Sequence, residues 1–109
     1  MKLLTFRETT RFTKKIVELL DDESYAQFQL FLAEFPAGGD LIKGGGGIRK
    51  MRVALPGRGK SGGARVIYFW IGTDDLIWLL DIYPKNEQAD LSDEQIKLLN
   101  REVKGLTKQ

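Results

Sequence analysis

The sequence predicts an α+β domain with the element order β-α-α-β-β-β-α, in which helices pack on an antiparallel sheet. Apolar residues recur at helical spacing before residue 36 and after residue 92, whereas the segment between them is rich in alternating, β-branched and aromatic residues. The chain has 109 residues and no internal repeat or linker. We therefore expect a single domain that spans residues 1–109.

The first part of the chain predicts one strand and two helices. Lys2–Phe6 is expected to form a short opening strand. Thr9 or Thr10 can cap a first helix that ends near Leu20, because a threonine hydroxyl accepts hydrogen bonds from free amides at a helix start. A second helix must end before Pro36, because proline breaks helical hydrogen bonding.

The middle of the chain predicts the sheet. Leu41-Ile42 is a candidate for a brief strand, and Ile48–Leu55 alternates between apolar and polar residues. Ala64–Ile71 and Leu76–Tyr83 are almost continuously apolar, which indicates central strands that are covered on both faces.

A last helix is predicted to begin at Ser92, because Ser92 and Gln95 form the pattern of a capping box. Its apolar stripe follows at helical spacing and consists of Ile96, Leu99, Val103 and Leu106.

The composition excludes several kinds of chemistry. The chain has no cysteine and no histidine. It therefore has no disulfide framework and no thiolate nucleophile, and it lacks histidine, which is the commonest general base and the commonest metal ligand. Any catalysis must depend on Lys, Arg, Tyr, Asp or Glu, and we expect no metal ion and no cofactor.

Charge is segregated along the chain. Residues 1–40 and 74–109 carry net charges of −2 and −3, whereas residues 41–73 carry seven basic side chains and no acidic one. A segment of charge +7 is typical of a site for a polyanion. The alternative is that positive strands pack against negative helices within one fold.

A glycine-rich hairpin tip lies inside the basic segment. Gly57–Gly62 matches the letters of a dinucleotide-binding loop, and it also resembles a Walker A loop. Both loops require a helix after the glycines, and here a strand is predicted to follow. What remains is a basic tip in which Arg58 and Lys60 can contact phosphates.

A denser cluster of cations is predicted on the neighbouring strands. Alternation places Lys50 and Arg52 on one face of the sheet, and Arg65 can join them across the hairpin. Like charges that are brought together destabilise a fold. The cluster therefore favours a phosphate-binding role over a solvated edge of the sheet.

Tyr83 and Lys85 close the last predicted strand, where a rigid sheet presents side chains to a ligand. The alternative is that Tyr83 is a core aromatic and that Lys85 forms a weak surface pair with Glu87.

Three motifs in this order resemble those of the RelE/HigB-type toxins of bacterial type II toxin–antitoxin systems, and most closely the HigB subgroup of the RelE/ParE superfamily. They are Gly-Gly-Ile-Arg-Lys at residues 46–50, Gly-Lys-Ser-Gly-Gly-Ala-Arg at residues 59–65, and Tyr-Pro-Lys-Asn-Glu at residues 83–87. The resemblance extends over roughly residues 2–104. It implies a RelE/ParE-like fold and a ribosome-dependent endoribonuclease that cleaves mRNA in the ribosomal A site, inhibits translation and is held inactive by a cognate antitoxin.

The resemblance also implies roles for individual residues. Arg65 matches an arginine that stabilises the phosphate, Lys50 and Arg52 match basic positions of the preceding strand, and Lys85 lies near a basic residue that acts on the leaving group in some relatives. Positive neighbours favour the neutral form of a lysine amine, so Lys50 is the candidate general base.

Four further cations, Lys43, Arg49, Arg58 and Lys60, would bind the RNA backbone. Several relatives carry a catalytic tyrosine at the start of the last helix, where this chain has Leu91 and Ser92. Tyr83 is the nearest tyrosine and is therefore the candidate at this site.

Two other functions fit the same residues. One is a ParE-like gyrase inhibitor, and the other is a non-catalytic basic module that binds nucleic acid. The expected partners are a small helix-turn-helix or partly disordered antitoxin, the ribosome and mRNA. The longest apolar runs, such as Val66–Ile71, are far shorter than the ~18–20 residues of a membrane span. No signal peptide opens the chain, so we expect a cytoplasmic protein without contact with a membrane.

Overall fold

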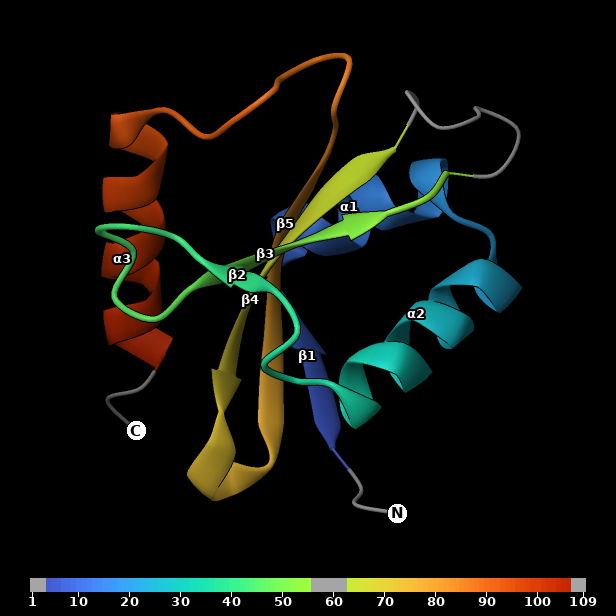
Figure 1. Cartoon of the computed structure of the whole chain (residues 1–109), viewed down its shortest axis with the longest axis horizontal. Coiled ribbons are helices and arrows are strands. Elements are labelled where there is room, and N and C mark those ends of the chain that lie inside the picture. The colour runs from blue at the N-terminus through green and yellow to red at the C-terminus, as the bar shows by residue number, and fades with distance from the viewer. Residues whose placement is uncertain (1–3, 56–62, 107–109) are drawn as a thin grey trace.

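The computed structural model describes residues 4–55 and 63–106 and shows three α-helices and a five-stranded sheet within them (Figure 1). The order along the chain is β1 (Thr5–Glu8), α1 (Thr10–Leu19), α2 (Asp22–Glu34), β2 (Asp40–Leu41), β3 (Arg49–Val53), β4 (Ala64–Ile71), the short 3-10 helix η2 (Gly72–Asp74), β5 (Leu76–Pro84) and α3 (Asp93–Leu106). The α+β class is confirmed. The brief strand is confirmed at Asp40–Leu41, so the order contains one strand more than predicted.

The sheet has the strand order β1-β5-β4-β3-β2. Strands β2 to β5 form the predicted antiparallel meander, but β1 pairs with β5 in parallel. The prediction of a purely antiparallel sheet was therefore wrong for the first strand. A parallel partner needs a long crossover, and the two helices and three strands between β1 and β5 supply it. The first strand also begins at Thr5, later than predicted.

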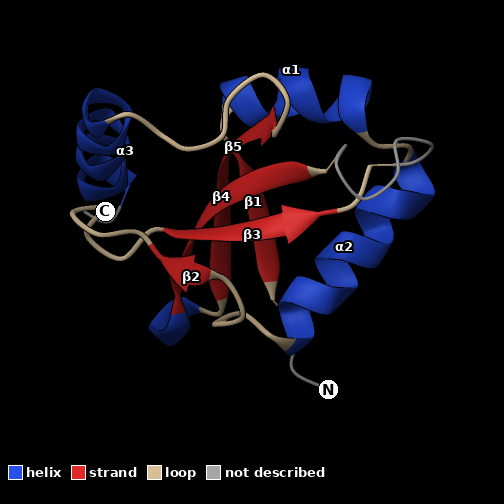
Figure 2. Ribbon diagram, turned by 45° about the horizontal axis from the view of Figure 1, so that its top comes forward, coloured by secondary structure: helices blue, strands red, loops and turns tan. Residues whose placement is uncertain are grey.

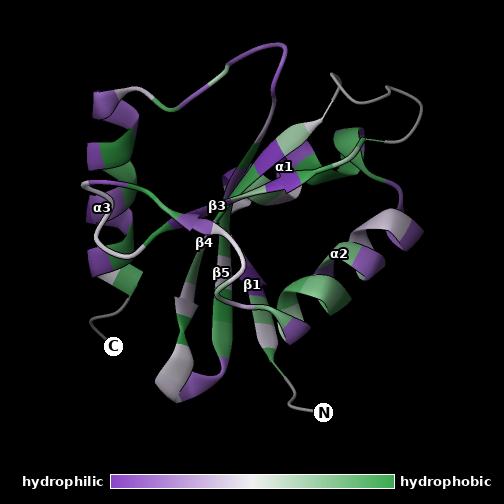
Figure 3. Ribbon diagram, viewed as in Figure 1, coloured by the Kyte–Doolittle hydropathy of each residue, from purple (hydrophilic) through white to green (hydrophobic). Residues whose placement is uncertain are grey.

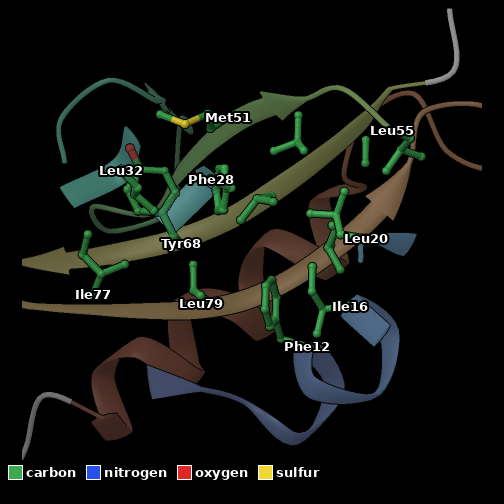
Figure 4. Packing of buried hydrophobic residues seen from close by; sticks show 14 residues of the cluster. Phe12, Ile16, Leu20, Phe28, Leu32, Met51, Leu55, Tyr68, Ile77 and Leu79 are labelled. Carbon is green, nitrogen blue, oxygen red and sulfur yellow. The ribbon is translucent and has the colours of Figure 1, made fainter. Parts of the chain in front are cut away.

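Helices α1 and α2 cover one face of the sheet, and α3 covers part of the other (Figure 2). The first face carries the larger core, in which side chains from both helices meet those of β3, β4 and β5 (Figure 4). The core under α3 is smaller and includes Ile48, Ile67, Leu99 and Val103. Figure 3 shows the apolar side of α3 turned toward the strands and its polar side turned outward. Burial of each such aliphatic side chain contributes roughly 1.5–3 kcal/mol.

Side-chain caps begin the helices where the sequence indicates. The hydroxyl of Thr9 accepts from the amide of Phe12 at 3.1 Å, which confirms one of the two predicted caps of α1. At α3 the predicted capping box is confirmed. The Gln95 amide donates to Ser92 Oγ at 3.2 Å, and the Ser92 amide donates to Gln95 Oε1 at 2.8 Å.

The glycine run before β3 supports a tight loop against α3. Gly44, Gly46 and Gly47 have positive φ angles of 80°, 71° and 108°, which side chains with a Cβ rarely adopt. Asn100 of α3 donates to the carbonyl of Gly44 at 3.1 Å. The loop is thereby held beside the last helix.

A charged network ties α1, β5 and α3 together. Asp81 of β5 is 9% exposed and accepts from Lys15 Nζ at 2.8 Å. The Arg11 guanidinium lies 3.5 Å from Asp81 and 2.7 Å from Glu102 of α3.

None of the helices within the described residues is long and apolar enough to cross a membrane.

Candidate functional site

The strand register brings three predicted cations together on the face of the sheet that α3 partly covers. Arg52 of β3 lies opposite Arg65 of β4, and Arg65 in turn lies opposite Tyr83 of β5. Residues directly opposite each other in an antiparallel pair project from the same face, and Lys50 joins them because it is two positions from Arg52. The predicted shared face of Lys50, Arg52 and Arg65 is confirmed.

Arg65 and Tyr83 each present a buried polar atom without a partner. Nη1 of Arg65 and the hydroxyl of Tyr83 are inaccessible to solvent and have no hydrogen-bond partner among the described residues. A buried polar group without a partner costs about 1–3 kcal/mol. Two such groups on adjacent strand positions therefore indicate a site that is prepared for a ligand.

The environment of Tyr83 favours its neutral form. Burial raises the pKa of the phenol above its ordinary value of 10.0, and the nearby carboxylate of Asp90 raises the pKa further, whereas Arg65 lowers it. Tyr83 therefore keeps its proton at neutral pH and can donate it in a hydrogen bond.

Asp90 is a site residue that the sequence analysis missed. Its Oδ1 lies 3.3 Å from Nζ of Lys50, forty positions away along the chain. The carbonyl of Asp90 accepts from Gln88 at 2.8 Å, and Gln88 also contacts Gln95 of α3. An acidic residue after a strand is too common to be singled out, so the sequence carried no usable signal for Asp90.

An open cavity of about 530 Å³ lies between β2, the loop that follows it, and the start of α3. Lys50 and Tyr83 form one part of its wall. The complete lining consists of Leu41, Ile42, Lys43, Lys50, Tyr83, Asp90, Leu91, Asp93 and Ile96. The predicted RNA contact Lys43 therefore lies at the same site as two of the predicted catalytic residues.

Arg52 and Arg65 of the cationic face, together with Arg49 and Lys85, do not line this cavity. Arg49 belongs to the opposite face, where its Nη1 donates to the carbonyls of Ala37 and Gly39 at 3.2 and 2.8 Å. This placement gives Arg49 a structural role and separates it from Lys50. Lys85 is exposed just after β5, and its backbone amide donates to the carbonyl of Gly63 at 2.9 Å. Arg58 and Lys60 lie outside the described residues.

The fold of this protein is similar to that of one chain in a known toxin–antitoxin complex. A chain in the crystal structure of the intact E. coli RelBE toxin–antitoxin complex matches with a TM-score of 0.56 and 17% sequence identity, over 73% of this chain and 94% of that chain. At this identity the match shows the fold.

The sequence model of the RelE toxin of the RelE/RelB toxin–antitoxin system matches residues 3–109. The chain therefore belongs to the RelE toxin family of toxin–antitoxin systems. The resemblance seen in the sequence is confirmed at the level of this family, and the HigB subgroup remains a prediction.

Proposed function

We propose that this protein is a ribosome-dependent endoribonuclease of the HigB subgroup, which cleaves mRNA in the ribosomal A site and so inhibits translation. Its membership of the RelE toxin family supports this function. The observation that carries the proposal is the pair of buried, unpartnered atoms of Arg65 and Tyr83 beside Lys50 and Arg52. Such a group of donors on a rigid sheet suits the charge that develops on a phosphate during cleavage.

The chemistry of RNA cleavage assigns a task to each residue. The 2′-hydroxyl must lose a proton, the phosphorus must be attacked in line, and the leaving 5′-oxygen must gain a proton. Arg65, with Arg52, would stabilise the non-bridging oxygens. Lys50 would serve as the general base once the RNA has displaced its carboxylate partner Asp90. Tyr83 holds a proton at the site. Lys85, just after the end of β5, would act on the leaving group.

The remaining cations would bind the RNA backbone away from the reacting phosphate. Lys43 lines the cavity that contains Lys50. Arg58 and Lys60 belong to the basic segment of the sequence between β3 and β4. Contacts of this kind position a nucleic acid without reading its sequence. Because the proposed substrate is mRNA on the ribosome, we expect the protein to act in the cytoplasm.

We also propose a cognate antitoxin that covers the cationic face with an acidic segment. Lys50 already binds a carboxylate of its own chain, that of Asp90. A glutamate or aspartate of a partner can bind in the same way, and such a contact would block access of RNA to Lys50 and Arg65.

The experiment is induced expression in a translating lysate, followed by primer extension on a reporter mRNA. We expect cuts within codons at the A site, and Arg65→Ala should reduce cutting by about 100-fold or more, the usual effect of removing one charge-stabilising donor. Arg101→Ala, an exposed position on α3, is the matched control and should cut like the wild type.

Continued translation with intact mRNA would overturn the proposal. A DNA-damage response with undamaged mRNA would point instead to a gyrase inhibitor. Salt-dependent RNA binding without cleavage, only weakened by Arg65→Ala, would indicate a non-catalytic binding module.

A further inference from the structure

The cavity beside Lys50 has two chemically different parts. Lys50 and Tyr83 in its lining suit a phosphate. Other lining residues are aliphatic, with Ile42 just after β2 and Leu91 and Ile96 around the start of α3. Aliphatic walls do not bind phosphate or ribose hydroxyls, but they do contact the flat faces of a nucleobase.

Two carboxylates complete the lining and are unexpected in a site for RNA. Asp90 is paired with Lys50, and Asp93 is the first residue of α3. Carboxylates repel phosphates, so a site that bound only the RNA backbone would be weakened by both. A carboxylate accepts hydrogen bonds, however, and the amino groups of nucleobases donate them.

The unpartnered hydroxyl of Tyr83 indicates that a ligand occupies this cavity next to the phosphate site. Tyr83 is 4% exposed, lines the cavity, and has no hydrogen-bond partner for its hydroxyl among the described residues. Satisfied tyrosines elsewhere in the fold show that this is not a general property. The hydroxyl of Tyr68, for example, donates to the carbonyl of Pro36 at 2.9 Å and accepts from the amide of Gly39 at 2.8 Å.

Both walls of the cavity are held in place before any ligand binds. On the helix side, Gln88 and the capping box fix the segment that contains Asp90 and Asp93. On the sheet side, the bond from Asn100 to Gly44 fixes the loop after Ile42. A preformed pocket binds its ligand with little cost in conformational entropy.

We propose that this cavity is a nucleobase pocket that selects a base bearing an amino group, and guanine above the others. Guanine carries two adjacent donors, N1–H and the 2-amino group, which match the two oxygens of one carboxylate. Uracil presents a single donor, N3–H, between two carbonyl oxygens, so it can donate only one hydrogen bond to a carboxylate, which also repels the carbonyls. Asp93 is the residue that reads the base, since Asp90 is engaged with Lys50. This inference rests on the proposed function, because it places one nucleotide of the RNA substrate next to the phosphate site.

The test is a titration of the free protein with mononucleotides, followed by NMR of the methyl groups of Ile42, Leu91 and Ile96. Guanosine monophosphate should shift these signals and bind about 10-fold or more tightly than uridine monophosphate, the usual effect of hydrogen bonds to a charged group. Inosine monophosphate lacks only the 2-amino group and should bind more weakly than the guanosine compound.

Asp93→Asn should remove most of the preference for guanosine monophosphate, because the amide offers one acceptor and one donor in place of two acceptors. Asp74→Asn, in η2, is the matched control and should keep the preference. Both changes are conservative and lie at exposed positions, so the variants should fold. The dispersion of signals in their NMR spectra shows whether they are folded.

Three results would overturn the pocket: no methyl shift with any nucleotide, equal binding of all three, or equally tighter binding of all three to Asp93→Asn. The last result would show that Asp93 acts only through its charge. A clear preference for guanosine monophosphate in a protein that cuts no mRNA would establish the pocket and refute the proposed nuclease.

Discussion

The buried tyrosines on the two faces of the sheet differ in how completely their hydroxyl groups are satisfied. On the face covered by α1 and α2, Tyr68 is fully buried and its hydroxyl has two backbone partners. On the α3 face, Tyr83 is almost as deeply buried, but its hydroxyl has no partner among the described residues. The hydroxyl of Tyr68 is thus used for stability, whereas that of Tyr83 is left to a ligand.

Two neighbouring residues of β3 show the same contrast. Arg49 projects toward the α2 side and binds two backbone carbonyls, whereas Lys50 projects to the other side and lines an open cavity. Both are basic, and both belong to the Gly-Gly-Ile-Arg-Lys motif by which the chain resembles the RelE/HigB-type toxins. Their different surroundings show that a basic residue in a motif acquires its role from the face on which it lies.

The largest expected effect separates these two residues. Lys50→Ala should reduce mRNA cleavage by about 100-fold or more with little loss of stability, because its partner Asp90 is exposed and an exposed ion pair contributes only about 0–1 kcal/mol. Arg49→Ala should leave cleavage within a few-fold and lower the free energy of unfolding by about 1–3 kcal/mol. Primer extension and urea denaturation of both variants check this, and a reversed outcome would mean that the faces have been assigned wrongly.

The two tyrosines should differ in stability. Tyr68→Phe leaves a buried amide and a carbonyl without their partner and should cost about 1–3 kcal/mol. Tyr83→Phe removes a hydroxyl that has no partner among the described residues, so its free energy of unfolding should equal or slightly exceed that of the wild type. Denaturation curves at neutral pH measure the free energy of unfolding of both variants. A loss at Tyr83 as large as that at Tyr68 would show that the hydroxyl is satisfied in the free protein.

Alkaline pH should affect both faces. Burial is the main cause that raises the pKa of Tyr25, Tyr68 and Tyr83 above the ordinary value of 10.0. A raised pKa means that the folded state favours the neutral phenol. The contribution to stability is therefore fully present below the unfolded pKa of about 10 and is lost as the pH rises above it.

We thus expect the denaturation midpoint to depend little on these groups between about pH 7 and pH 9 and to fall above about pH 10. The tyrosinate absorbance, followed in the same samples, should rise with unfolding. Titration of all three tyrosines near their ordinary pKa in the still folded protein would contradict this account.

The smallest expected effect concerns the capping box of α3. Ser92→Ala removes the acceptor for the amide of Gln95 and should cost about 1 kcal/mol. Since the same segment positions Asp90 and the wall of the cavity, cleavage should fall modestly, by less than for Lys50→Ala. Ser92→Asp, which keeps a capping oxygen, should restore both properties, and a variant that stays defective would show that capping is not the cause.

The sequence predicted most elements because each has a local signal. The helices follow from the spacing of apolar residues, and the caps at Thr9 and Ser92 follow from side chains that reach only three positions along the chain. Alternation also predicted the shared face of Lys50, Arg52 and Arg65. The same alternation places Arg49 on the opposite face, away from Lys50, and its contact with RNA stays a prediction.

The α+β class and the basic middle segment follow from the sequence, as does the absence of histidine and cysteine, which restricts any catalysis to other side chains. Three features depend on the packed fold: β1 lies parallel to β5, Asp90 pairs with Lys50, and the buried hydroxyl of Tyr83 has no partner among the described residues. The two groups of features differ in distance along the chain. Hydrophobic periodicity and capping act over a few residues, whereas strand partners and burial depend on segments that only the packed fold brings together.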